Sequence, residues 1–204
     1  MKKKQKETKQ DRTKSIGGSD ATRIFDGDWY QLWSEKVGET KPADLSEVLP
    51  VQMGIATESL NIQWFERLFK TKVKDKQLHL IHPKYDFITA NLDGRLKDGT
   101  IFDAKHTNAF STSAKVAVKY NAQMQHYMMV ANSNKSILSV FFGNLKHEVI
   151  EIPRDDDFIE RLLNAEVLFW HMVTNKIAPP DYISFENFDA ERNKHEAIPV
   201  ISRI

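Results

Sequence analysis

Two aspartates and a lysine stand at a spacing that can support hydrolysis of a phosphodiester. Residues 91–105 contain Asp93, nine further residues, and then Asp103-Ala104-Lys105. Carboxylates on neighbouring strands can hold a hard cation such as Mg²⁺ through oxygen. Alternate strand residues share a face, so Asp103 and Lys105 point the same way, and the lysine can act on a phosphate or a water beside the metal. The same spacing also suits the solvent-exposed face of an ordinary hairpin.

The turn between the two aspartates decides whether their side chains meet. A two-residue turn at Asp98-Gly99 would place Asp93 opposite Ala104, which puts the carboxylates on different faces. A three-residue loop over 97–99, with Gly99 in the left-handed conformation, pairs Leu96 with Thr100. That register places Asp93 opposite Asp103 and Asn91 opposite Lys105. We predict the three-residue loop, and a structure with the aspartates on opposite faces would contradict a metal site.

Hydrophobic periodicity predicts a mixed α/β domain in which helices surround a small central sheet. Ser19 is expected to cap a first helix. Helices are expected over 28–37, 52–69, 115–130 and 156–175, a strand over 78–81, and hairpins over 87–96 with 100–106 and over 136–142 with 147–152.

Composition and charge narrow the function classes. The chain has 204 residues, of which 28% are charged, and its net charge is +1. Residues 1–14 carry seven basic and two acidic side chains, so we expect a flexible basic arm over 1–15, suited to a polyanion such as DNA, and one domain over 16–204. Cysteine is absent, which excludes disulfides, thiolate metal sites and cysteine nucleophiles. No apolar run predicts a membrane span or a secretory signal.

Six short motifs in order resemble the YqaJ-type viral recombinases, the family that includes phage lambda exonuclease. The resemblance covers residues 12–181. The motifs are Arg12-x₆-Ser19 in an Ile-Gly-Gly-Ser-Asp-Ala context, Trp29-x₃-Trp33-x₂-Lys36, Met53-Gly54-x₃-Glu58, His82-Pro83-x-Tyr85-x₇-Asp93-Gly94 with Asp103-Ala104-Lys105, Tyr120-x-Ala122-Gln123-x-Gln125, and Phe169-Trp170 before Pro179-Pro180. This chain departs from the family in having Asp103 in place of the usual Glu, Leu92 in place of a frequent Pro, and a lysine-rich arm in place of aromatic residues.

The resemblance implies a PD-(D/E)xK restriction-endonuclease-like core and an exonuclease that needs Mg²⁺, with Mn²⁺ as a substitute and two ions bound. It implies digestion of one strand of double-stranded DNA from the 5′ end, which leaves a 3′ overhang for recombination. By analogy it also implies a homo-oligomer such as a ring trimer, a single-strand annealing partner, and the cytoplasm of a bacterial host.

The family motifs give roles to particular residues. Asp93 and Asp103 would be metal ligands, with the Ala104 carbonyl as a third, and Lys105 would orient or deprotonate the attacking water. Glu58 shares the expected inner face of its helix with Ile55, Ile62 and Phe65, where a carboxylate needs a metal or a hydrogen-bonding partner. Helical geometry turns Gln123 inward and Gln125 outward, so Gln123 would bind the water or a phosphate oxygen. Arg12 and Ser19 would hold the 5′-terminal phosphate.

Two other classes of function stay open at this point. One is a different PD-(D/E)xK nuclease, such as an endonuclease, which closed circular DNA would distinguish from an exonuclease. The other is a DNA-binding protein without catalytic activity on the same fold. The joint presence of Asp93, Asp103, Lys105, Glu58 and Gln123 argues against this last class.

Overall fold

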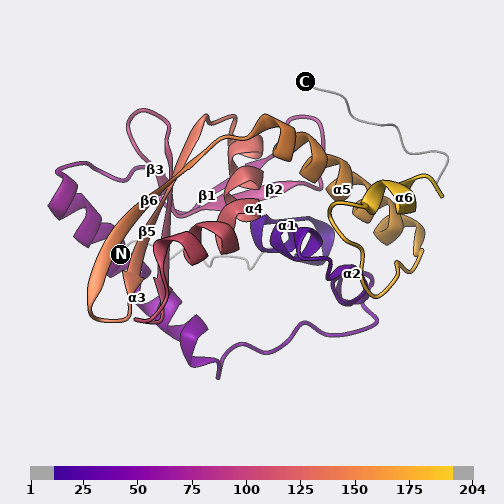
Figure 1. Ribbon diagram of the computed structural model, residues 1–204, viewed down its shortest axis with the longest axis horizontal. Helices are drawn as coiled ribbons and strands as arrows, with labels where there is room; N and C mark the ends of the chain where they lie inside the picture. The colour runs from indigo at the N-terminus through magenta and orange to yellow at the C-terminus, as the bar shows by residue number, and fades with distance from the viewer. Residues whose placement is uncertain (1–11, 195–204) are drawn as a thin grey trace, which may run out of the picture.

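The computed structural model describes residues 12–194, which form helices packed around two small sheets (Figure 1). The elements in chain order are the 3-10 helix η1 (Arg12–Lys14), α1 (Gly18–Phe25), α2 (Trp29–Val37), α3 (Leu49–Phe69), β1 (Leu78–Ile81), β2 (Thr89–Leu92), β3 (Gly94–Arg95), β4 (Ile101–Thr107), α4 (Ser113–Ala131), β5 (Lys135–Phe142), β6 (Lys146–Pro153), α5 (Asp156–Asn175) and α6 (Phe188–Arg192). None of these helices has the length and apolar character needed to cross a membrane. Residues 1–11, which hold most of the expected basic arm, lie outside the described range.

The central sheet has four strands in the order β3-β4-β5-β6. The β4–β5 pair is parallel and the other two pairs are antiparallel. A parallel pair needs a crossover connection, and α4 supplies it between β4 and β5. The strands β1 and β2 form a separate antiparallel pair. The mixed α/β architecture expected from the sequence is therefore confirmed.

Apolar side chains alternate in direction along the strands and form two clusters, one on each face of the central sheet. Phe102 and Ile137 pack with Ile62 and Phe65 of α3 on one face. The other face is covered by α4 and α5, where Ile101, Leu138, Val140 and Phe142 meet Met124, Met128, Ile159 and Leu163. Since neighbouring strand residues point to opposite faces, Phe102 serves one core while Asp103 faces the side of α4.

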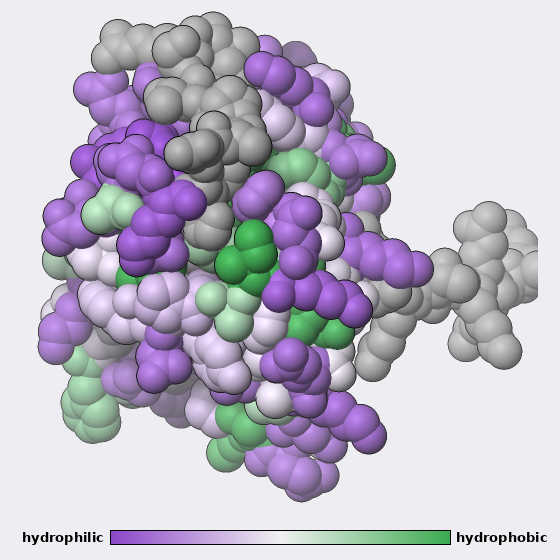
Figure 2. Space-filling model, turned by 90° about the vertical axis from the view of Figure 1, so that its right-hand side faces the viewer, coloured by the Kyte–Doolittle hydropathy of each residue, from purple (hydrophilic) through white to green (hydrophobic). Residues whose placement is uncertain are grey.

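A second apolar cluster joins α1 and α2 to α5 and to residues 183–188. Trp29, Leu32 and Trp33 of α2 pack there against Phe169 and Met172 of α5. Figure 1 shows α1 and α2 beside α5, on the side of α4 away from β5 and β6. On the side of the molecule that carries α2 and α6, hydrophilic residues predominate and hydrophobic residues form small separate patches (Figure 2).

The structure corrects two expectations about local elements near the site. The predicted strand over 87–96 is broken at Asp93, so that β2 pairs with β1 and only β3 pairs with β4. Asn91 therefore lies opposite His79, and the prediction that it faces Lys105 is wrong. The first helix has Gly17 and not Ser19 at its N-cap, because the Asp20 carboxylate accepts a hydrogen bond from the Gly17 N–H at 3.0 Å.

Residues 12–15 also differ from the sequence expectation. The charge pattern predicts that they belong to the flexible arm, but η1 contacts α2 and Ile16 forms a bridge to Ile88. The part of the chain that the structure describes is therefore anchored from Arg12 onward, which fixes Arg12 close to α1.

Candidate active site and DNA-end pocket

The hairpin between β3 and β4 brings the two aspartates face to face. The register pairs Gly94 with Phe102, which places Asp93 opposite Asp103. Leu96 N–H donates to the Thr100 carbonyl at 2.9 Å across a three-residue loop, and Gly99 has a φ of +88°. The predicted loop and register are therefore confirmed. Gly99 suits this loop because glycine adopts the left-handed conformation without steric cost.

The two carboxylates share a buried position with one lysine. Asp103 is 1% exposed, and its Oδ2 lies 2.6 Å from Nζ of Lys105. Within the described residues, the ammonium of Lys105 is the contact that Asp103 Oδ2 makes, and this buried oxygen accepts no further hydrogen bond. Asp93 Oδ2 accepts a hydrogen bond from the Ala104 N–H at 2.8 Å. One ammonium thus faces two carboxylates.

The electrostatics of the aspartate pair favour a bound cation. Burial, together with the nearby charge of Asp103, raises the pKa of Asp93 to about 8. Burial opposes the charge of Lys105, but the attraction of Asp103 and Asp93 outweighs it and raises the lysine pKa. The Lys105 ammonium also lies 4.7 Å from the centre of the Tyr120 ring. Two buried carboxylates beside one ammonium repel each other's negative charge, and a hard divalent cation bound between them would relieve that repulsion through its preferred oxygen ligands.

Glu58 is not gathered into the aspartate pair. It is half-buried on α3, and its Oε1 accepts a hydrogen bond from Gln77 Nε2 at 2.5 Å. Its charge is one of the causes that raise the Asp93 pKa, so it lies within electrostatic range. Within residues 12–194 no three acidic, histidine or cysteine side chains converge as a metal site. The expected inner face of α3 is also only partly correct, since Ile55 is 65% exposed while Ile62 and Phe65 are buried.

Gln123 lies on α4 beside a tyrosine that the sequence did not single out for the site. Gln123 Nε2 donates a hydrogen bond to the Tyr127 hydroxyl at 2.8 Å. Burial and the charge of Asp103 raise the pKa of Tyr127, so the phenol is neutral and close to the aspartates. Gly18 allows this approach of α1 to α4, because a Cβ at Gly18 would lie 2.5 Å from Tyr127 Cε1.

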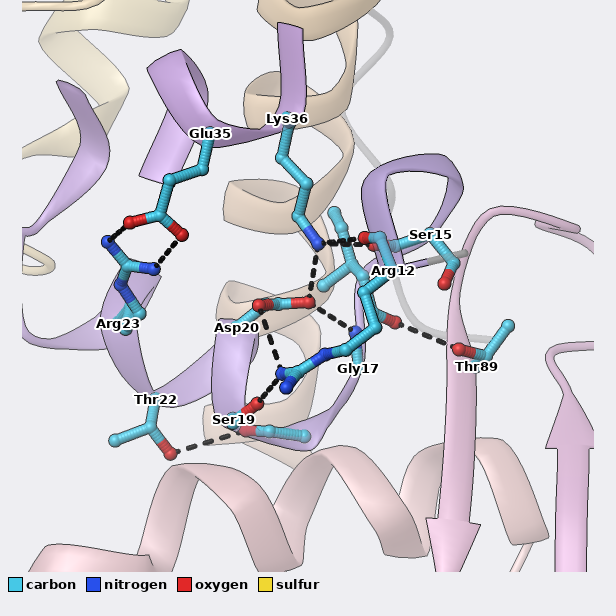
Figure 3. Close-up of polar contacts among 12 residues, drawn as sticks. Arg12, Ser15, Gly17, Ser19, Asp20, Thr22, Arg23, Glu35, Lys36 and Thr89 are labelled. Atoms are coloured by element: carbon cyan, nitrogen blue, oxygen red, sulfur yellow. Dashed lines mark hydrogen bonds and ion pairs between the residues drawn. The ribbon is translucent and has the colours of Figure 1, made fainter. Parts of the chain in front are cut away.

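Arg12 and Ser19 form a polar pair at the start of α1 (Figure 3). Arg12 Nη2 donates to Ser19 Oγ at 2.6 Å and lies 3.9 Å from Asp20 Oδ1. The Arg12 side chain is 73% exposed, which leaves the guanidinium accessible to an anion. A cavity of about 280 Å³ joins this pair to Gln123, and it is lined by Arg12, Ser15, Gly17, Gly18, Ser19, Asp20, Thr89, Asn91, Gln123 and Tyr127. The structure thus places both predicted phosphate residues and the predicted glutamine around one cavity.

Comparison with known proteins identifies the family of this chain. The family model of the YqaJ-like viral recombinase domain matches residues 8–134. The chain belongs to the YqaJ-like viral recombinase family. The protein YqaJ of Bacillus subtilis (strain 168) is 30% identical in an alignment that covers 90% of this chain and 64% of that protein. This member of the family therefore spans less than two thirds of that relative's length.

Comparison with solved structures shows that this chain has the PD-(D/E)xK fold. The alkaline exonuclease LHK-Exo of Laribacter hongkongensis, in complex with dAMP, superposes with a TM-score of 0.67 at 16% identity, over 90% of this chain and 95% of that chain. A phage-related exonuclease from Haemophilus somnus 129PT gives a TM-score of 0.58 at 15% identity, over 78% of this chain and 84% of that one. At such identities the likeness shows a shared fold, and the predicted fold class is confirmed.

Two buried polar networks near the site were not predicted from the sequence. One contains Gln125 and the other joins His126 to Glu166. Gln125, expected at the surface, is 2% exposed; it donates to the Pro153 carbonyl at 2.9 Å and accepts from the Asp155 N–H at 3.0 Å. His126 is fully buried between Glu166 and the Thr89 carbonyl. A histidine on the apolar face of a helix could have signalled a buried partner, but its partner Glu166 lies forty positions away and no local spacing connects them.

Proposed function

We propose that this chain is a metal-dependent exonuclease that digests one strand of double-stranded DNA from its 5′ end. The observation that carries the proposal is a cavity that Arg12, Ser19 and Gln123 line together, with Tyr127 between it and Asp103. A cavity of about 280 Å³ is close to the lower end of the range for small ligands, which suits one terminal nucleotide. Residues that can hold a terminal phosphate therefore stand next to residues that can hydrolyse the following phosphodiester.

The metal site in this proposal is built on Asp93 and Asp103, with the Ala104 carbonyl as a third ligand. The burial of Asp103 and the mutual repulsion of the two carboxylates support this assignment. Glu58 would join, directly or through water, after release from Gln77. A bound Mg²⁺ or Mn²⁺, as one ion or two, would polarise the phosphodiester and lower the pKa of a water.

The remaining residues act on the water and the phosphate. Lys105 stands beside Asp103, where its positive charge can stabilise the charge that develops on the phosphate oxygens. Gln123 keeps its amide oxygen available while its Nε2 donates to Tyr127, so it can orient the attacking water. Hydrolysis breaks the bond between phosphorus and the 3′ oxygen, releases a nucleotide with a 3′ hydroxyl, and leaves a new 5′ phosphate on the shortened strand.

That product explains why a phosphate site belongs beside the metal site. Each cycle regenerates the 5′ phosphate that Arg12 and Ser19 would bind. The guanidinium offers paired donors for phosphate oxygens, and Ser19 lies at the N-terminal turn of α1, where anions are favoured. The complementary strand would remain as a 3′ overhang for an annealing protein, in the cytoplasm, with a homo-oligomer such as a ring trimer around the duplex.

A strand-labelled cleavage assay tests the proposal. Linear duplexes with one labelled strand are compared with closed circular DNA in Mg²⁺, in Mn²⁺ and in excess chelator. We expect loss of the 5′-ended strand from linear DNA only, and no cleavage after chelation. Cleavage of circles would instead indicate an endonuclease. Binding without cleavage in both metals would indicate a non-catalytic DNA-binding protein.

Arg12→Ala should reduce the preference for 5′-phosphorylated over 5′-hydroxyl ends by about tenfold or more, because a hydrogen bond to a charged group contributes about 1.5–3 kcal/mol. The measurement is the ratio of kcat/KM on two duplexes that differ only in the 5′ phosphate. Lys97→Ala, in the exposed turn of the β3–β4 hairpin, is a suitable control. An unchanged ratio in Arg12→Ala would remove this residue from the phosphate pocket.

A further inference from the structure

Lys36 is a buried lysine whose ammonium serves the segment that carries Arg12. Its side chain is 5% exposed, and Nζ donates to the carbonyl oxygens of Arg12 at 2.6 Å and Ser15 at 2.7 Å. The third contact of Nζ is Asp20 Oδ2 at 2.8 Å. Figure 3 shows these bonds reaching from α2 to the turn before α1, at Arg12 and Ser15, and to Asp20 in the first turn of α1. Three acceptors require three N–H donors, so the geometry calls for the charged form of Lys36, and no donor is left for a ligand.

The three bonds fix where the Arg12 side chain begins. Residues 12–15 contribute η1 and a bend, and the segment next joins the body of the protein at Ile16, where the Ile16 N–H donates to the Phe87 carbonyl at 2.6 Å. Lys36 holds the two carbonyls at either end of this turn. Because a guanidinium must lie within hydrogen-bond distance of a phosphate, displacement of its backbone by about an ångström weakens the contact strongly.

Lys36 also reduces the competition of Asp20 for the Arg12 guanidinium. Arg12 Nη2 lies 3.9 Å from Asp20 Oδ1, so this carboxylate competes with any bound phosphate for the guanidinium. Lys36 binds the other oxygen of the same carboxylate, which also accepts the Gly17 N–H at 3.0 Å. Because Lys36 balances the charge of Asp20, this carboxylate competes less for the exposed Arg12 guanidinium, which stays available to an anion.

We propose that Lys36 is a positioning residue that sets the preference of this enzyme for 5′-phosphorylated DNA ends. The inference rests on the proposed function, and specifically on Arg12 and Ser19 as the phosphate site. Lys36 acts on the DNA end only through Arg12 and Asp20. Its expected effect is therefore on the binding of phosphorylated ends and not on the hydrolysis at the aspartates.

A second ion-pair network between the same helices supplies a matched control. Arg23 of α1 bonds Glu35 of α2 at 2.8 and 3.1 Å and Asp28 at 2.7 Å. Figure 3 shows this fork beside the Lys36 bonds but directed away from the turn. Arg23→Met therefore removes a comparable link between α1 and α2 without removing a bond to residues 12–15.

The test measures kcat and KM separately on duplexes with 5′-phosphate or 5′-hydroxyl ends. Lys36→Met should raise KM for phosphorylated ends by about tenfold, the equivalent of one charge-assisted hydrogen bond, with a smaller change in kcat. Arg23→Met should keep the preference of the unmodified chain. Since Lys36→Met leaves Asp20 buried without its partner, the double variant Lys36→Met/Asp20→Asn, which buries no unpaired charge, carries the test if the single variant fails to fold.

We expect the double variant also to lose the preference, because the carbonyls of Arg12 and Ser15 still lack their donor. A folded double variant with an unchanged ratio would overturn the inference, as would an equal loss of preference in Arg23→Met. A lack of preference in the unmodified chain would remove the phosphate site itself, and the role of Lys36 with it. The unmodified chain thus tests the proposed pocket, and the variants test Lys36.

Discussion

Asp103→Asn should reduce strand cleavage by at least about a thousandfold, since a metal ion contributes several kcal/mol to phosphodiester hydrolysis and each 1.36 kcal/mol is a factor of ten in rate. Asparagine keeps the shape of the side chain but removes the charge that would bind the cation. It also removes the ion-pair partner of Lys105, whose Nζ lies 2.6 Å from Asp103 Oδ2. The measurement is the single-turnover rate on a linear duplex in Mg²⁺, with DNA binding and thermal unfolding recorded for the same sample.

Asp98→Asn is the matched control in the same hairpin. The Asp98 carboxylate accepts the Thr100 N–H at 3.0 Å in the exposed loop and does not contact the aspartate pair. Asparagine can accept the same hydrogen bond, so cleavage should stay close to that of the unmodified chain. A folded Asp103→Asn variant that cleaves at a comparable rate would contradict the metal assignment, whatever the fold.

The part of the site that depends on local geometry could be predicted from the sequence. The length of the loop over 97–99 determines the register, and the register places Asp93 opposite Asp103. The break in the strand at Asp93 could not be predicted from the alternation of residues alone. There the Asp93 carboxylate itself accepts the Ala104 N–H, in place of a carbonyl of a continued strand, and β2 is free to pair with β1.

The part of the site that depends on packing between distant elements could not be predicted from local patterns in the sequence. The family resemblance implies a role for Gln123, but its proximity to Ser19 results from the close contact of α1 with α4 at Gly18. The hydrogen bond that directs Glu58 toward Gln77 joins a helix to the segment before β1, and no periodicity encodes it. Helix phase likewise misplaced Gln125, because a side chain outside the main apolar stripe can still be covered by a neighbouring connection, here the one from β6 to α5.

His126→Leu should lower the free energy of unfolding by about 3–5 kcal/mol, the cost typical of removing one partner from a buried ion pair. His126 Nδ1 lies 2.7 Å from Glu166 Oε1, and Nε2 lies 2.8 Å from the Thr89 carbonyl. Leucine would leave both acceptors buried without a donor, and Glu166 Oε2 already lacks a partner. The pair ties α4 to α5 and to β2, the strand that leads into Asp93. Chemical denaturation at several pH values measures the effect.

The pH dependence of this loss has a definite sign. Burial opposes protonation of His126, but the charge and hydrogen bond of Glu166 outweigh it and raise the histidine pKa above its ordinary value of 6.5. Asp20 contributes in the same direction, and the neighbouring His82 has its own pKa lowered, first by burial and then by the charge of His126. Because the folded protein binds the proton more tightly than the unfolded chain, this stabilisation is complete below pH 6.5 and is lost as the pH rises through the higher folded pKa. The difference between the unmodified chain and His126→Leu should therefore shrink at alkaline pH.

An exposed pair and a double variant distinguish burial from charge as the cause. Glu151→Gln breaks the surface pair with Lys135, whose side chains are 58% and 45% exposed, and should cost less than about 1 kcal/mol. The double variant His126→Leu/Glu166→Leu removes the Glu166 charge, which the single variant leaves buried without a partner. The double variant should therefore recover much of the lost stability, even though the Thr89 carbonyl remains unpaired. A double variant no more stable than His126→Leu would mean that the imidazole acts chiefly through Thr89 and β2. In that case the histidine would stabilise the strand before Asp93 by a hydrogen bond and not through the ion pair with α5.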